Sequence, residues 1–310
     1  MNKMEFKHYP VMLKETVDFL DIKKGGIYVD CTLGGGGHSG EVLKRLDGTG
    51  RLISIDRDTA AIENAKKLFA GADNLTTVHS SFDELENILD SLNIDKIDGI
   101  MMDLGVSSYQ IDNPERGFSY MSDAPLDMRM DGTESFSAYD IVNGYSEEKL
   151  TDIFFTYGEE RHSRRIAAAI VSERAISPIK TTGQLVDIIA SKIPAHEKGH
   201  PAKRCFQAIR IEVNNELRQI EPTIKTAADK LKEGGRIAVI SFHSLEDAIV
   251  KKTFAFLAKG CICPKDFPVC VCGKKPEVEI LTKKPILPSE NELMENNRSA
   301  SAKLRAAVKL

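Results

Sequence analysis

The sequence predicts an α/β fold in which a parallel sheet, covered by helices, is interrupted by an inserted helical region. Short apolar segments alternate with amphipathic ones over 27–104, the alternation then stops, and a further apolar segment follows at 235–241. Alternation at this spacing is typical of a doubly wound sheet. We therefore expect a discontinuous sheet domain, residues 1–106 and 215–310, around an all-helical domain at 107–214.

The individual elements follow from the periodicity of apolar residues. Each expected strand is a short run rich in Ile, Val and Leu, and each expected helix carries its apolar side chains on one face. The expected strands are 27–33, 51–56, 75–79, 97–104 and 235–241. The expected helices are 39–46, 59–70, 83–92, 147–155, 159–175, 181–193, 203–220 and 221–233. The tail from residue 260 is expected to be irregular until a short helix near 289–307.

The composition is that of a globular protein, with 42% hydrophobic and 28% charged residues. No segment approaches the roughly 20 apolar residues that a membrane span needs. The first ten residues contain no apolar run, unlike a signal peptide. Six cysteines in so long a chain do not indicate a secreted disulfide scaffold. We expect a cytoplasmic protein without a membrane partner.

The net charge of −4 conceals an uneven distribution. Residues 1–160 contain 15 Lys and Arg against 30 Asp and Glu. The ratio reverses to 11 against 5 in residues 161–220 and to 12 against 6 in residues 251–310. Two basic regions suit a polyanionic partner such as RNA. Solvated helix faces are the simpler alternative.

A glycine-rich loop follows the first expected strand and opens the first expected helix. It contains four consecutive glycines, Gly34 to Gly37, between Asp30 and His38, and Asp56 ends the next strand. Glycines allow a ligand to approach the backbone closely, and a helix N-terminus offers unpaired N–H groups. An acid at this distance suits hydrogen bonds to ribose hydroxyls. The combination predicts a nucleotide-type cofactor site, with a tight turn as the alternative.

The glycine pattern also bears on which cofactor binds. NAD(P) sites favour a G-x-G-x-x-G pattern with the pyrophosphate at the helix N-terminus, whereas these glycines are consecutive. S-adenosylmethionine has no phosphate and needs groups near its ammonium and carboxylate, which Asp30 and the glycine backbone offer. Phe82, after the third strand, is a candidate to cover the adenine. A place in the core suits Phe82 equally.

Polar residues follow the fourth expected strand. Asp103 ends it, and Ser107, Ser108 and Gln110 come next. The C-terminal ends of parallel strands line the ligand crevice of an open α/β sheet. We therefore expect Asp103 to face the cofactor, with the following polar groups near the methionine moiety or the methyl acceptor. A turn with a helix cap is the alternative.

Eight ordered segments spread over the chain carry a family resemblance. They are Gly-Gly-Gly-Gly-His-Ser at 34–39, Ile-Asp-Arg-Asp at 55–58, Asp-Leu-Gly-Val-Ser-Ser at 103–108, Arg-Gly-Phe-Ser at 116–119, Leu-Asp-Met-Arg-Met at 126–130, Phe-Gln-Ala-Ile-Arg-Ile-Glu-Val-Asn-Asn-Glu-Leu at 206–217, Ile-Ser-Phe-His-Ser-Leu-Glu-Asp at 240–247 and Lys-Leu-Arg-Ala-Ala at 303–307. The chain thereby resembles the ribosomal RNA small-subunit methyltransferase H family.

The resemblance implies a Rossmann-like class I methyltransferase sheet with an inserted all-helical substrate-recognition domain. It also implies an S-adenosylmethionine-dependent enzyme that methylates the N4 amine of a decoding-centre cytidine in 16S ribosomal RNA, either free or within the small ribosomal subunit. It implies cofactor-binding roles for Gly36, Gly37, His38, Asp56, Phe82, Asp103 and Gln110.

The chain departs from known patterns at two places. Tyr109 stands where proline is common in the family, which affects the loop that carries Gln110. The Pro-Pro-aromatic motif of DNA amino-methyltransferases is replaced by Leu-Gly-Val-Ser-Ser. The residue that clamps the target base is therefore open, with Phe118 and Tyr120 as candidates for stacking and packing under a loop as their alternative.

The reaction needs a proton acceptor, because the lone pair of the cytosine amine is delocalised into the ring. Asp103 and His243 are the candidate catalytic residues, since Asp103 ends one expected strand and His243 follows another. Cofactor binding for Asp103 and a structural role for His243 are the alternatives. The candidate RNA-contacting residues are Arg204, Gln207, Arg210, Asn214 and Ser244. An ordinary polar helix face is the alternative for the first four.

Four cysteines cluster in the tail with the spacing C-x-C-x6-C-x-C: Cys261, Cys263, Cys270 and Cys272. Four thiolates could hold a structural Zn²⁺ ion. The spacing departs from the usual C-x2-C, and we therefore expect free or oxidisable thiols in preference to zinc.

Two other functions are compatible with parts of the sequence. An NAD-dependent dehydrogenase would explain the glycine loop and Asp56, but neither the consecutive glycines nor the basic regions. A non-catalytic RNA-binding factor in ribosome assembly would explain the charge distribution. The oligomeric state is open and includes a homodimer.

Overall fold

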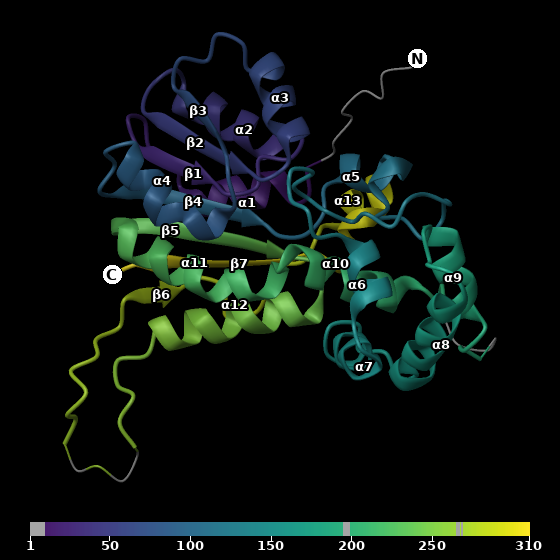
Figure 1. Cartoon of the computed structure of the whole chain (residues 1–310). Coiled ribbons are helices and arrows are strands. Elements are labelled where there is room, and N and C mark those ends of the chain that lie inside the picture. Colours follow the sequence, from purple (N-terminus) through teal and green to yellow (C-terminus); the bar gives the residue numbers. More distant parts are fainter. Residues whose placement is uncertain (1–9, 195–198, 265–266, 268) are drawn as a thin grey trace. The chain divides into compact units, whose positions relative to one another are not determined.

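The computed structural model describes residues 10–194, 199–264, 267 and 269–310. The first ten residues, on which the expected absence of a signal peptide rests, lie outside these residues except for Pro10. The chain divides into two compact units (Figure 1). The first contains Met1–Gly105 and Leu217–Leu310, and the second contains Val106–Glu216. These boundaries lie close to those expected at 107 and 214.

The first unit is built on a seven-stranded sheet of order β3-β2-β1-β4-β5-β7-β6. The strands are β1 (Ile27–Asp30), β2 (Arg51–Asp56), β3 (Leu75–His79), β4 (Ile97–Asp103), β5 (Leu231–Ser241), β6 (Val278–Ile280) and β7 (Lys303–Lys309). Strands β1 to β5 pair in parallel, and β7 lies antiparallel between β5 and β6. The expected α/β, Rossmann-like fold class is confirmed.

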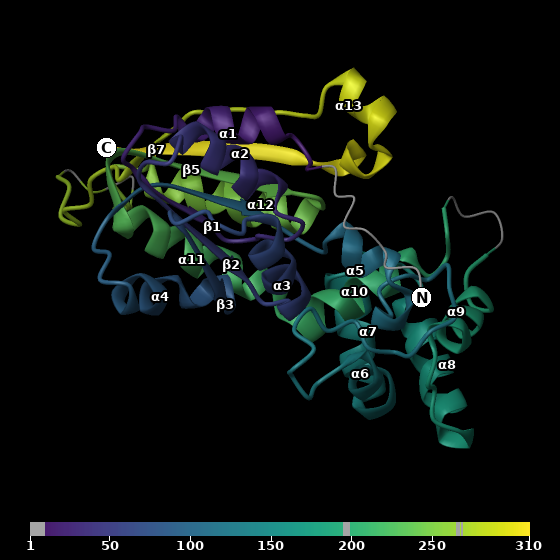
Figure 2. The same cartoon turned by 90° about the horizontal axis from the view of Figure 1, so that it is seen from above.

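The sheet strands are buried on both faces, and their apolar side chains alternate between two helical layers. Tyr28 packs with helices α1 (Leu13–Leu20) and α2 (Gly37–Leu46). The next residue, Val29, packs on the opposite face. That face is covered by α4 (Leu85–Ser91), α11 (Glu216–Lys230) and α12 (Ser244–Leu257) (Figure 2). Helix α3 (Thr59–Leu68) forms a smaller cluster with Leu33.

The strand order places three carboxylates at one edge of the sheet. Asp30, Asp56 and Asp103 are the last residues of β1, β2 and β4. These strands are neighbours and run in parallel, so their C-terminal ends lie together. This is the edge at which open α/β sheets bind ligands.

The second unit is helical and has its own hydrophobic core, which contains Phe154, Leu185 and Ile209. Its helices are α5 (Ser108–Asp112), a 3-10 turn at Pro114–Arg116, α6 (Ala138–Gly144), α7 (Glu147–Thr156), α8 (Ser163–Ile176), α9 (Thr182–Ala190) and α10 (Lys203–Asn214). The helices expected from residue 147 onward agree with the structure apart from shifts at several ends, whereas α5, the 3-10 turn and α6 were not predicted.

The structure corrects two predicted elements. The expected helix 203–220 instead ends at Asn214, because Asn215 adopts a left-handed conformation (φ 51°), and α11 begins at Glu216. Asparagine tolerates this conformation better than most residues. The expected helix 289–307 is also wrong: α13 (Glu290–Glu295) and a 3-10 turn at Asn297–Ser301 precede strand β7.

Within the described residues, no helix is both long enough and apolar enough to cross a membrane.

Candidate active site

The glycine loop turns sharply into α2. Gly36 has φ of 84°, a conformation that favours glycine, and a Cβ at Gly37 would lie 2.8 Å from Pro10. No side chain caps the N-terminus of α2, so its first-turn N–H groups are not used by a capping side chain. The loop therefore presents backbone donors at the ligand edge of the sheet.

Asp56 is held by this loop. Its Oδ2 accepts a hydrogen bond from the Gly34 N–H at 2.7 Å, and its Oδ1 accepts one from the Asp58 N–H at 2.8 Å. Burial raises the pKa of Asp56 from 3.8 to about 6, although these two N–H groups act in the opposite direction. The carboxylate is thus fixed in position but incompletely compensated.

Asp30 has a structural role. It is fully buried, and its Oδ2 accepts a 2.7 Å hydrogen bond from Ser39 Oγ. Ser39 Oγ in turn lies 2.7 Å from Ser54 Oγ. These contacts tie α2 to β1 and β2, which fixes the start of α2.

His38 and Asp103 lie next to each other beneath the loop. His38 Nε2 lies 3.1 Å from the Val11 carbonyl oxygen, and its Nδ1 lies 3.8 Å from Asp103 Oδ2. Asp103 Oδ1 is buried and has no hydrogen-bond partner among the described residues. Burial, together with the negative charges of Asp30 and other acids, raises the pKa of Asp103 well above its ordinary range. Asp103 is therefore the carboxylate with the least compensation from hydrogen bonds within the described residues.

Within the described part of the chain, none of Asp30, Asp56 and Asp103 forms an ion pair with a lysine or arginine. Buried negative charge without a matching cation favours a ligand that brings positive charge. S-adenosylmethionine carries a sulfonium and an ammonium group, whereas the pyrophosphate of NAD would be repelled. The three carboxylates thus fit the cofactor expected from the sequence.

Phe82 stands at the border between core and site. It begins a 3-10 turn, packs against the core below the sheet, and is only partly buried. The guanidinium carbon of Arg57 lies 5.9 Å from its ring centre, and Arg57 donates to Ser81 Oγ at 2.6 Å. The ring is thus positioned both by apolar packing and by a cation above it.

Gln110 belongs to the second unit. Ser107 and Gln110 form a capping box at the start of α5, in which Ser107 N–H donates to Gln110 Oε1 at 3.0 Å. Gln110 is 4% exposed. Its side-chain oxygen therefore orders the loop after β4.

His243 and its neighbours stabilise the start of α12. His243 Nε2 lies 3.0 Å from Glu246 Oε1, and Glu246 Oε2 accepts from the backbone N–H of Phe242 at 2.8 Å. Ser244, the first residue of the helix, is exposed. The carboxylate of Glu246 holds the turn after β5 through the backbone N–H groups of Phe242 and His243, and the His243 ring lies beside it.

Three of the four predicted RNA contacts in α10 are used inside the second unit. Asn214 Oδ1 accepts from Met130 N–H at 2.7 Å, and Asn214 Nδ2 donates to the Met128 carbonyl oxygen at 2.8 Å. Arg210 binds both carboxylate oxygens of Glu216 at 3.0 Å. Gln207 donates to the Tyr157 carbonyl oxygen at 3.0 Å.

The fourth predicted contact, Arg204, lies in an exposed basic patch. The other residues of this patch were not predicted individually as RNA contacts. Arg204 is half-exposed, and its Nη1 lies 3.8 Å from the buried Glu160 carboxylate. This contact brings the start of α10 beside the segment that leads into α8. The exposed basic residues there, named the α8/α10 patch below, are Arg161, Arg164, Arg165, Lys203 and Arg204. The sequence feature that pointed to this patch was the excess of basic residues in 161–220.

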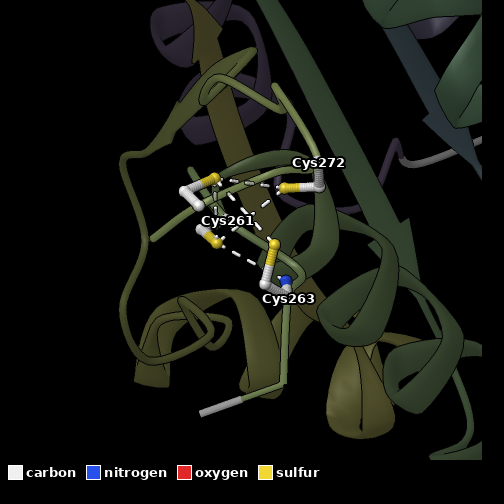
Figure 3. Close-up of side chains that lie close together, drawn as sticks. Cys261, Cys263 and Cys272 are labelled. Atoms are coloured by element: carbon white, nitrogen blue, oxygen red, sulfur yellow. Dashed lines mark hydrogen bonds between the residues drawn. The ribbon is translucent and has the colours of Figure 1, made fainter. Parts of the chain in front are cut away.

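The four tail cysteines converge in the loop between α12 and β6, with sulfur atoms within 4.8 Å of one another (Figure 3). They form a site separate from the carboxylate edge described above.

Comparison with known proteins establishes the family. The model of the MraW methylase family matches residues 5–310. Ribosomal RNA small subunit methyltransferase H of Clostridium botulinum (strain Loch Maree / Type A3) is 57% identical over 309 residues, which is 99% of this chain and 100% of that protein. The protein of the same name from strain Kyoto / Type A2 matches equally. The chain belongs to the MraW methylase family.

Among solved structures, a rRNA methylase from Streptococcus thermophilus aligns over 96% of this chain and 99% of its own at 11% identity, with a TM-score of 0.43. Membership of the MraW methylase family confirms the resemblance found in the motifs. It confirms a methyltransferase with S-adenosylmethionine as cofactor and excludes the NAD-dependent dehydrogenase.

Proposed function

We propose that this methylase transfers a methyl group from S-adenosylmethionine to the N4 amine of a decoding-centre cytidine in 16S ribosomal RNA. The 57% identity over the whole chain to proteins named ribosomal RNA small subunit methyltransferase H carries the proposal. The choice of atom and nucleotide rests on the motif resemblance. The partner is the small-subunit RNA, free or assembled.

The carboxylate edge of the first unit holds the cofactor, which when bound supplies an electrophilic methyl group on a sulfonium. Asp56 accepts hydrogen bonds from its ribose hydroxyls, since each carboxylate oxygen has a second lone pair beyond the one that binds a backbone N–H. The N–H groups of Gly37 and His38 at the start of α2 suit its carboxylate. Phe82 would cover the adenine, and Gln110, at the start of α5, is a further proposed cofactor-binding residue.

Asp103 is the proposed acceptor for the proton of the target amine. Transfer of the methyl group would exchange its bond to sulfur for a bond to nitrogen and leave a neutral thioether, so the amine would have to release one proton. A buried carboxylate without a hydrogen-bond partner is a strong acceptor for that proton. Its Oδ1 takes up the proton of the amine. A cationic cofactor favours the ionised form of Asp103 beforehand, because opposite charge lowers a carboxyl pKa. His243, which contacts Glu246, positions the turn after β5.

The helical unit binds RNA through the α8/α10 patch. Arginine pairs well with phosphate, and Arg161, Arg164 and Arg165 are exposed and form no ion pair with described residues. Arg210 and Asn214 act on RNA indirectly, because they hold the second unit together. Ser244 is exposed and stays a candidate contact in the first unit.

The test is transfer of labelled methyl groups to small-subunit RNA that lacks the modification, offered as free RNA and as assembled subunits. Mass spectrometry of the digested nucleosides should find the label in N4-methylcytidine. Label in another nucleoside would overturn the proposed target, and no label with either substrate, despite cofactor binding, would overturn the RNA substrate.

A variant separates catalysis from a purely RNA-binding role. Asp103→Asn keeps the size of the side chain but removes its basicity, so methylation should fall by at least about 10²-fold while RNA binding is unchanged. Asp98→Asn, on the same strand but at its other end, is the matched control. If Asp103→Asn leaves ribosome assembly intact although methylation is lost, the non-catalytic assembly factor is favoured.

A further inference from the structure

The four tail cysteines form a compact group of sulfur atoms. The Sγ–Sγ distances are 3.4 Å for Cys261–Cys270, 3.6 Å for Cys270–Cys272, 3.8 Å for Cys261–Cys272 and 4.0 Å for Cys263–Cys270. With Zn–S bonds of about 2.3 Å, the edge of a tetrahedral four-sulfur site is about 3.8 Å. The observed spacing is therefore that of sulfurs around one zinc ion, and no disulfide joins them.

The backbone around the sulfurs is arranged in a reciprocal way. Ile262, between the first two cysteines, donates its N–H to Cys272 Sγ at 3.4 Å. Val271, between the last two, donates its N–H to Cys263 Sγ at 3.4 Å. The C-x-C spacing, which departs from the usual C-x2-C, thus places in each arm an N–H that points at a sulfur of the other arm. Such N–H groups stabilise thiolates and orient metal ligands.

The loop has little else to order it. Its apolar side chains face solvent: Ile262 is 48% exposed, Phe267 48%, Val269 70% and Val271 73%. A segment that cannot bury its own apolar side chains generally needs a covalent or metal cross-link to keep one conformation. The sulfur cluster is the part of the described loop that is close-packed.

We propose that Cys261, Cys263, Cys270 and Cys272 bind one Zn²⁺ ion in a closed, four-thiolate structural site. Four protein ligands complete the tetrahedron, so no position is left for water or substrate and the ion takes no part in methyl transfer. Four thiolates around Zn²⁺ leave a charge of −2, and Lys259, Lys274 and Lys275 lie within three residues of a ligand. The ion cross-links the two arms of the loop between α12 and β6. This inference is independent of the proposed RNA target.

The test is zinc analysis of the full chain, purified under reducing conditions without added chelator. We expect one zinc per chain by elemental mass spectrometry, and Co²⁺ replacement should give the visible bands of tetrahedral cobalt with sulfur-to-metal charge transfer. Cys272→Ser and Cys261→Ser should each lose the zinc on dialysis. Val271→Ser, in the same arm but not a ligand, should retain it.

Three outcomes would overturn the site. One is a reduced protein that holds no zinc and gives no cobalt bands when the metal is supplied in excess. Another is zinc that persists in both cysteine variants, which would place the ion elsewhere in the chain. The third is a pair of disulfides under the same reducing conditions, detected by mass spectrometry after alkylation.

Discussion

With Asp56 as the proposed ligand of the cofactor ribose, cofactor binding should depend on pH, because burial beside the glycine loop raises the pKa of this carboxyl group from 3.8 to about 6. A ribose hydroxyl pair donates hydrogen bonds to the ionised form, and a cationic ligand is attracted to it. Below pH about 6 the proton competes with the ligand. Protonation therefore removes the acceptor and the negative charge together.

We predict that the affinity for S-adenosylmethionine falls about tenfold between about pH 7 and about pH 5. Isothermal titration calorimetry in buffers of different ionisation enthalpy measures both the affinity and the protons released. The pKa of Asp103 is raised in the same direction and adds to the release. Asp56→Asn should bind more weakly at pH about 7 and lose part of the pH dependence. An affinity that is flat across this range would contradict the prediction.

The same shift has the opposite sign for the stability of the ligand-free protein. A carboxyl group whose folded-state pKa is raised binds its proton more tightly when folded. Its contribution to the free energy of unfolding is therefore full below pH about 4 and is lost as the pH rises to about 6. Cofactor binding reverses this loss, because the ligand prefers the ionised form.

Asn214 supports a turn far away in the sequence. Its amide binds the Met128 carbonyl and the Met130 N–H, and Met128 has a left-handed backbone (φ 59°) that is costly for this residue. We predict that Asn214→Ala destabilises the second unit by about 1–3 kcal/mol. Hydrogen exchange should show lost protection at 128–130 without RNA present. Lys203→Ala, exposed on the same helix, is the control, and unchanged protection would contradict the structural role.

The sequence could predict the strand-end carboxylates but not the roles of the α10 side chains. Asp56 and Asp103 follow from position, because the ends of parallel strands meet at one edge. Asn214 and Arg204 share a polar helix in the sequence, yet one is buried and the other exposed. The partners that decide this, Met128 and Glu160, belong to segments that periodicity cannot bring together.

At the scale of elements, the C-terminal strand shows where local propensity fails. The residues of β7, Lys-Leu-Arg-Ala-Ala-Val-Lys, favour a helix by composition. The segment instead fills the space between β5 and β6, and Ala306 and Ala307 are fully buried against the two strands. Small side chains fit where helices cover both faces, so tertiary pairing overrides the intrinsic preference. The parallel strands β1 to β4, with their continuous apolar runs, were predictable.

The ion pair of Arg305 and Asp247 joins β7 to α12. Arg305 Nε and Nη2 donate to the two carboxylate oxygens at 2.6 and 3.2 Å, and both side chains are largely buried. Although burial raises the pKa of Asp247, these hydrogen bonds hold it below its ordinary value. Arg305→Leu would leave a buried carboxylate with Lys303, 3.6 Å away, as its remaining basic neighbour.

We predict that Arg305→Leu lowers the free energy of unfolding of the first unit by about 3 kcal/mol. Arg305→Leu combined with Asp247→Leu should recover part of that loss, because the uncompensated charge is removed. Urea unfolding of the single and double variants, followed by exchange protection in β7, measures both. A double variant that is less stable than Arg305→Leu would show that the pair contributes mainly through packing.

At the scale of the whole molecule, the chain separates its two chemical requirements. The acidic edge of the sheet suits a cationic cofactor, and the basic excess of residues 161–220 in the helical unit suits a polyanion. Building the helical unit as an insertion after β4 connects it to the strand that ends in Asp103. The two units were predictable from the change from alternating strands to helices near residue 105, whereas the charge changes sign only near residue 160, inside the helical unit.

The charge division makes RNA binding depend on salt in a way that can be assigned to one surface. Each phosphate contact that is lost should reduce the slope of log affinity against log salt by about 0.7–0.9. We predict that Arg164→Ala combined with Arg165→Ala, in the α8/α10 patch, lowers that slope by about 1–2 and weakens binding to different RNA sequences alike. Lys66→Ala combined with Lys67→Ala removes two exposed charges from α3 in the first unit and is the matched control. Equal slopes for both double variants would mean that RNA senses only net charge, whereas a change confined to the α8/α10 patch would identify it as the phosphate-binding surface.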